Sequence, residues 1–174
     1  MRWRSIAWGL GALACAAGLS ACVTEPVAGT PKREVRRPTP DATPTRLVLA
    51  VDSRASDSNG DGVHETILVT AYVFADPRRF DTPYWPEGSF EFRASSTTSD
   101  EVPDARWRHS PEATSQARAR FGPGPAFVFA LSLDEAGADA RLVRGGAVQL
   151  RAWFQHSSGE RVSTGGEATV RLRG

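Results

Sequence analysis

Residues 57–65, DSNGDGVHE, form the densest group of oxygen-bearing side chains in the sequence. Asp57, Asn59 and Asp61 alternate along the chain, and Gly62 allows the sharp turn that would wrap it around an ion. Ca²⁺ takes about six to eight hard oxygen ligands, which alternating short carboxylates and backbone carbonyls supply. The pattern therefore predicts a structural calcium site, whose expected ligands are Asp57, Asn59, Asp61, Val63 and Glu65.

The D-x-N-x-D-G spacing resembles the calcium loops of EF-hands, dockerins and thrombospondin type 3 repeats. An EF-hand loop has a bidentate glutamate at its twelfth position, where this chain has Leu68, so a complete EF-hand is excluded. Asn-Gly and Asp-Gly pairs are also favoured in tight hairpin turns. Two interpretations stay open: a calcium loop flanked by strands, or a turn that binds no ion.

A second group of chemically distinctive residues lies in RRFDTPYWPEGSF, residues 78–90. Phe80, Tyr84 and Trp85 stand there among prolines in an expected loop. Exposed aromatic side chains on a rigid loop stack on sugar rings or anchor a protein partner. We expect these three residues to bind a partner, with the alternative that they close the open end of a hydrophobic core.

The sequence contains no recognised catalytic motif. His64, His109 and His156 are scattered and match no zinc-ligand spacing, and there is no G-x-S-x-G nucleophile turn. No glycine-rich phosphate loop occurs either. The sequence favours a protein that is not an enzyme. A hydrolase would need a deep pocket that holds at least two titratable groups with shifted pKa values.

The N-terminal residues, MRWRSIAWGLGALACAAGLSAC, have a short basic head followed by an uncharged stretch over residues 5–21. This is typical of an export signal peptide. The closing Leu19-Ser20-Ala21-Cys22 resembles the lipobox of bacterial lipoproteins. The resemblance implies a signal peptide over residues 1–21, palmitate and a second lipid on Cys22, and stable membrane anchoring through these lipids. Val23, in place of an aspartate after the cysteine, points to the outer membrane.

The mature chain divides by composition into a linker and one domain. Residues 22–45 hold the expected lipidated cysteine and a disordered stretch rich in Pro, Thr and charge. Residues 46–174 are long enough for one domain with a core. This domain has 15 arginines, no lysine and 17 acidic residues, a net charge of −2. A nucleic-acid-binding domain normally carries a strong basic excess, so we expect no nucleic-acid partner.

Hydrophobic alternation with a period of two dominates residues 46–174 and predicts β-strands. Ser110-Pro111-Glu112 is the one clear helix start, with a cap, a first-turn proline and an acid. We therefore expect an all-β fold: an antiparallel immunoglobulin-like or C2-like β-sandwich of about seven strands, with one short helix near 111–119. This layout resembles uncharacterised exported bacterial β-sandwich proteins. The expected strands cover RLVLAVD, ETILVTAYVF, SFEFRAS, FVFALSL, AVQLRAWFQ and EATVRLR, with a weaker one around Trp107.

Together these features favour a lipid-anchored module of the cell envelope that binds a protein or glycan partner and is stabilised by calcium if the acidic loop binds it. An assembly accessory lipoprotein that tethers an envelope complex is the alternative, and it predicts one exposed apolar patch. A hydrolase is the third hypothesis. A binding module predicts solvent-exposed Tyr84 and Trp85.

Overall fold

A computed structural model describes residues 34–172, apart from 59, 61 and 100. The expected signal peptide, Cys22, Asn59 and Asp61 lie outside the described residues. Residues Glu34–Gly174 form a compact unit, and every residue of the hydrophobic core lies within it, so this unit has what it needs to fold by itself. Among the described residues, no helix is long and apolar enough to cross a membrane.

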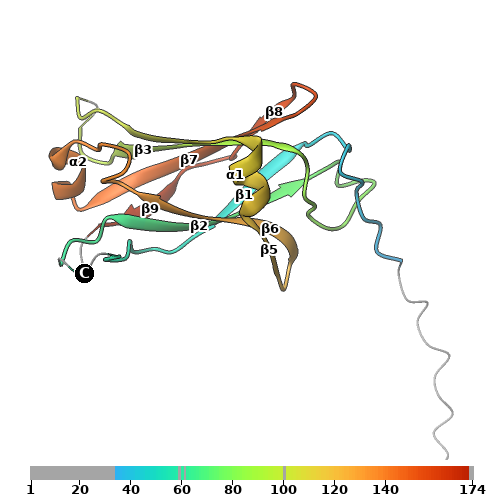
Figure 1. Cartoon of the computed structure of the whole chain (residues 1–174), viewed down its shortest axis with the longest axis horizontal. Coiled ribbons are helices and arrows are strands. Elements are labelled where there is room, and N and C mark those ends of the chain that lie inside the picture. The colour runs from blue at the N-terminus through green and yellow to red at the C-terminus, as the bar shows by residue number, and fades with distance from the viewer. Residues whose placement is uncertain (1–33, 59, 61, 100, 173–174) are drawn as a thin grey trace, which may run out of the picture. The chain divides into compact units, whose positions relative to one another are not determined.

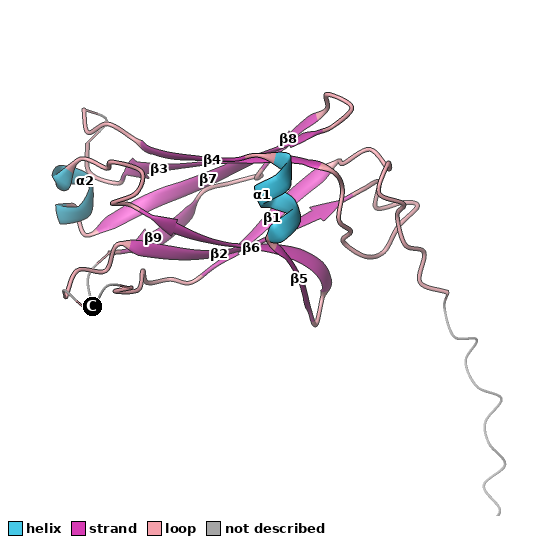
Figure 2. Cartoon of the chain, in the orientation of Figure 1, coloured by secondary structure: helices cyan, strands magenta, loops and turns pink. Residues whose placement is uncertain are grey.

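The described residues form two antiparallel sheets packed face to face, as Figures 1 and 2 show. One sheet has the order β1-β2-β6-β5; the other has the order β4-β3-β7-β8, with β9 also paired to β7. The expected all-β sandwich is confirmed. The strands are β1 (Arg46–Val51), β2 (Thr66–Phe74), β3 (Gly88–Ser96), β4 (Ala105–His109), β5 (Arg118–Phe121), β6 (Gly124–Ser132), β7 (Ala147–His156), β8 (Arg161–Ser163) and β9 (Ala168–Arg171).

Aromatic side chains from both sheets meet in the middle of the sandwich. The Phe90 ring lies 5.2 Å from Phe127, 5.1 Å from Phe129 and 4.9 Å from Phe154, measured between ring centroids. All four side chains are at least 96% buried. Because β3 and β7 belong to one sheet and β6 to the other, these contacts join the two layers, and tilted aromatic pairs of this kind add to the stability of a core.

The helix expected near 111–119 is shorter in the structure. Helix α1 (Pro111–Gln116) begins as predicted, with the Ser110 side chain accepting a hydrogen bond from the Ala113 amide. Residues 118–121 form β5 instead, because the Val128 amide bonds the Ala117 carbonyl and Arg118 pairs with Phe127. Pairing with β6 therefore outweighs local helix propensity.

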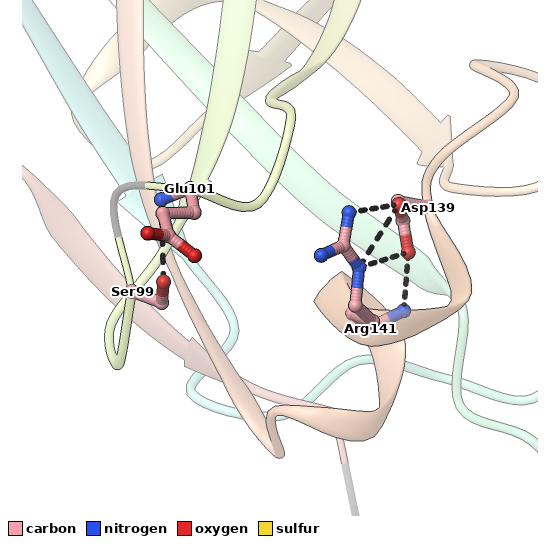
Figure 3. Close-up of polar contacts among 4 residues, drawn as sticks. All are labelled: Ser99, Glu101, Asp139 and Arg141. Carbon is pink, nitrogen blue, oxygen red and sulfur yellow. Dashed lines mark hydrogen bonds and ion pairs between the residues drawn. The ribbon is translucent and has the colours of Figure 1, made fainter.

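A second helix, α2 (Ala140–Arg144), was not among the predicted elements, which included only one helix, near 111–119. The Asp139 carboxylate caps it by accepting the Arg141 amide at 2.7 Å, and it also holds the Arg141 guanidinium (Figure 3). In the nearby loop before β4, the Glu101 amide donates a hydrogen bond to Ser99 Oγ (Figure 3).

Residues 34–45, expected in the linker, are in part fastened to the sandwich. The Arg36 carbonyl accepts the Asp81 amide at 3.3 Å, and the Thr45 amide bonds the Phe74 carbonyl at 2.8 Å. Ala42 packs against the core. Residues 35–40 of this segment form one wall of the surface described next.

Candidate functional site

The aromatic loop between β2 and β3 lies along the end of β2. A turn closes at the Phe80 amide, which bonds the Asp76 carbonyl at 3.0 Å. The chain then returns so that the Tyr84 amide bonds the Val73 carbonyl at 3.1 Å. Prolines on either side of Tyr84 and Trp85 restrict the backbone, so both rings are held on a rigid segment.

Tyr84 is buried, with only 4% of its surface exposed, and its hydroxyl donates to the Ala42 carbonyl. Burial raises the pKa of this phenol, and the negative charges of Asp41 and Glu160 raise it further. The expectation that Tyr84 is solvent-exposed is wrong: its ring belongs to the core, as the alternative interpretation had it. Phe80, half-buried, also packs against the core.

Trp85 is half-buried and held on two sides. Its indole N–H donates to the Ala126 carbonyl at 2.8 Å, and the Arg120 guanidinium lies over its ring, 5.0 Å from the centroid. A cation over an indole face is an attractive contact. Both interactions fix the ring between the aromatic loop and the β5–β6 hairpin, so its position does not depend on a bound partner.

These elements enclose an open hollow of about 350 Å³, the aromatic hollow. Three segments supply its walls: the N-terminal segment, the aromatic loop and the tip of the β5–β6 hairpin. Gly124 has φ 130°, and a Cβ there would lie 3.2 Å from the Pro83 ring, so the hairpin reaches this close to the loop only with glycine. The lining residues are Val35, Arg37, Pro38, Pro40, Thr82, Pro83, Tyr84, Trp85, Arg120, Gly122, Pro123, Gly124 and Pro125.

The residues that line the aromatic hollow are mostly apolar, and two of them are basic. Five of its lining residues are proline, and among the described residues that line it only Arg37 and Arg120 are charged. A wall of proline and aromatic carbon offers few hydrogen bonds to a sugar's hydroxyl groups, but it matches an apolar side chain. The two guanidinium groups add a preference for a carboxylate close to that side chain.

The acidic loop 57–65 is closed at its base by two hydrogen bonds between Ser56 and Thr66, of 2.8 and 3.0 Å. The Asp57 carboxylate accepts the amides of Gly60 and Gly62 at 2.6 and 2.8 Å. Both glycines have positive φ, 80° and 85°, which other residues rarely adopt. The chain therefore curls around the Asp57 carboxylate, a shape that serves a turn and an ion loop equally.

Glu65 contributes an unusual feature to this loop. Its side chain is 2% exposed; Oε1 accepts the Ser58 hydroxyl at 2.9 Å, whereas Oε2 has no partner among the described residues. A buried carboxyl oxygen without a partner is costly, and a cation would satisfy it. Among the described residues, no group of three or more His, Cys, Asp or Glu side chains is placed to hold a metal. Two of the expected ligands, Asn59 and Asp61, lie outside those residues.

A third surface, the outward face of the β4-β3-β7 sheet, was not identified as a site from the sequence. Trp153 stands there opposite Glu91, and hollows of about 460 and 520 Å³ both border it. Arg161 lies over its ring, 5.4 Å from the centroid, and pairs with Glu91 at 3.0 Å. The signal was available in AVQLRAWFQ, where alternation puts a tryptophan among outward polar residues.

Groups suited to catalysis are dispersed. The pKa of Tyr84 is raised by burial and that of His109 is lowered by burial, but each of these residues borders a different hollow. The Ser158 hydroxyl contacts both His156 Nδ1 and the Glu160 carboxylate. A serine-hydrolase triad requires the histidine between serine and acid, and here the serine is in the middle.

Comparison with protein-family models, with curated proteins and with solved structures finds no match to this chain.

Proposed function

We propose that this protein is a lipid-anchored, non-enzymatic module of the cell envelope that binds a protein partner in the aromatic hollow. The anchor would be the lipids on Cys22, and the outer membrane is its expected location. Calcium bound in loop 57–65 would stiffen that loop without taking part in recognition.

The observation that carries the proposal is the fixed Trp85 in an apolar, proline-walled opening. Its ring is held by Ala126 and Arg120 and does not need to rearrange to receive a ligand. Preformed pockets lined by aromatic residues are where binding energy concentrates in interfaces. With Arg37 and Arg120 at the same opening, the ligand class is a peptide segment with an apolar anchor beside an acidic residue.

Selection from a phage-displayed random peptide library on residues Glu34–Gly174 tests this class directly. We expect enrichment of peptides that place Phe, Leu or Trp next to Asp or Glu. The Arg120→Glu variant should weaken the selected peptides about tenfold, since a charge-assisted hydrogen bond contributes roughly 1.5 kcal/mol or more. Arg108→Glu, an arginine on the opposite sheet, is the matched control.

The proposal would be contradicted if no peptides with an apolar residue next to an acidic one were enriched. It would also be contradicted if the selected peptides bound Arg120→Glu as tightly as the unchanged protein. The Arg120 side chain is exposed and lies over the Trp85 ring, so circular dichroism and thermal unfolding of the variant check that the fold is intact.

A glycan partner is the second candidate, and the Trp153 surface favours it. Outward from β3 and β7, guanidinium and carboxylate groups pair next to the indole: Arg93 with Asp104, and Arg151 with Glu167 at 2.6 Å. Such pairs donate and accept hydrogen bonds side by side, as vicinal hydroxyls require. Retardation in gels containing cell-wall polysaccharides, abolished in Trp153→Ala and retained in Trp85→Ala, would favour this candidate over the peptide.

A further inference from the structure

The outward face of the other sheet is apolar where solvent would be expected. Alternation along β1, β2 and β6 turns the residues of one parity away from the core. Val48, Leu68 and Val128 are 39%, 42% and 36% exposed. None of the outward side chains in the middle of these strands is charged. This apolar sheet face comprises Val48, Ala50, Leu68, Thr70, Tyr72, Val128 and Ala130.

An antiparallel sheet with one face in water normally alternates apolar inside and polar outside. The β4-β3-β7 sheet follows that rule: Arg106, Arg93 and Arg151 lie in register across its outward face. The apolar sheet face departs from it over three adjacent strands. An apolar patch of this size on a monomer is often functional.

The two ends of this face carry opposite charge. Arg46 and Asp52 share the outward side of β1 and its extension: Arg46 lies over the Phe74 ring at 4.4 Å, and the Asp52 amide reaches the Leu68 carbonyl at 3.4 Å. Both side chains are exposed. After β6, Asp134 and Glu135 add acidic groups at the Asp52 end. At the Arg46 end, Arg78 and Arg79 are balanced by Asp76 and Asp81 in the same loop.

We propose that the apolar sheet face binds the same face of a second copy of this chain, with the strands of the two copies antiparallel. A twofold axis across the strands then brings Arg46 of each copy to Asp52 of the other, so both ends pair at once. The uncharged middle meets an uncharged middle, and Arg46 and Asp52 are paired at both ends. An anionic membrane surface would attract one end of the face but repel the other.

The area of the apolar sheet face determines how strongly two copies are expected to associate. Three strands about 4.8 Å apart and about 20 Å long give roughly 300 Å² in projection, below the ~800 Å² that each partner buries in a standard interface. Self-association is therefore weak in solution and depends on the paired ends. Anchoring on one membrane would raise the effective concentration and favour it. The inference does not depend on the aromatic hollow, which lies apart from this face.

Sedimentation velocity of residues Glu34–Gly174 over a range of concentrations tests the proposal. We expect a reversible monomer–dimer equilibrium that weakens when salt rises from about 50 mM to about 500 mM, since the end charges are screened. Leu68→Glu places an unpaired charge in the interface and should weaken association at least tenfold. Thr169→Glu is the matched control, because Thr169 is also exposed on a strand but lies on β9 of the other sheet.

Charge exchange separates this geometry from other modes of association. Arg46→Asp and Asp52→Arg should each weaken the dimer, and the double variant should restore it, because only the antiparallel arrangement pairs these two positions. A protein that stays monomeric at every concentration would overturn the proposal. Association that is unchanged in Leu68→Glu, or not restored in the double variant, would overturn it as well.

Discussion

At the scale of single residues, burial determines which side chains can exchange protons or contact a partner. His109 lies between Phe92 and Phe129, with ring-centroid distances of 5.8 and 4.6 Å, and its Nε2 has no partner among the described residues. A ring in this position is held as a neutral aromatic group rather than as a base. Tyr84 and Trp85 show the same principle. Both border the aromatic hollow, but the Tyr84 ring is buried in the core, whereas Trp85 is half-buried.

His109 makes folding sensitive to mild acid. Burial lowers the pKa of His109. Below about pH 6.5 this histidine therefore becomes protonated in the unfolded chain while it stays neutral in the folded chain. Stability should therefore fall as the pH drops from 6.5 toward the pKa of folded His109. His109→Phe keeps an aromatic ring there and should reduce this loss, whereas His64→Phe in the loop should not.

Thermal unfolding between about pH 7 and pH 5 measures the effect of His109. An identical loss of melting temperature in His109→Phe and in the unchanged protein would contradict it. The carboxyl groups whose pKa is lowered by hydrogen bonds are Asp41, Glu112, Asp139 and Glu160. They lose their contribution to stability as the pH falls below about 4, so they do not overlap this window.

At the scale of elements, the sequence predicts the long strands well and the short ones poorly. The ten residues of β7 alternate clearly between apolar and polar, whereas β8 has only three residues and was not predicted. Ser110 and Pro111 signal where a helix starts but not where it ends, so β5 was included in the helix. The apolar pattern on both sides of ETILVTAYVF predicted a central strand. The structure places β2 inside its sheet, but its outward face remains exposed.

Loop 57–65 gives a prediction at this scale. Calcium at about 10 mM should raise the melting temperature of residues Glu34–Gly174 by roughly 5 °C, given a dissociation constant of order 10⁻⁴–10⁻³ M. The shift should be lost in Asp61→Ala and kept in Glu135→Ala, whose carboxylate follows β6. Equal melting temperatures in chelator and in calcium would reduce the loop to a turn.

At the scale of the whole molecule, the two proposed contacts use separate surfaces of the described unit. The aromatic hollow lies at the end where the N-terminal segment joins, and the apolar sheet face covers one layer of the sandwich. The sequence could name the aromatic residues of the hollow but not its walls, because residues 35–40, 82–85 and 120–125 meet only in the folded chain.

Anchoring is also tested on the whole molecule. Cys22→Ser in the full chain should move the protein from the membrane fraction to the soluble fraction, because the lipids that would hold it are then absent. Fractionation with metabolic palmitate labelling measures this change. Label and membrane association that persist in Cys22→Ser would contradict the lipid anchor.

The binding of a peptide in the aromatic hollow is tested most directly by the indole N–H signals of residues Glu34–Gly174 in nuclear magnetic resonance spectra. This unit has three tryptophans, Trp85, Trp107 and Trp153, and Trp107 is buried with its indole on the Ser132 carbonyl, so it serves as an internal reference. Titration with a selected apolar and acidic peptide should shift the Trp85 signal and leave the other two in place. A shift confined to Trp153, or none at all, would contradict the proposed function.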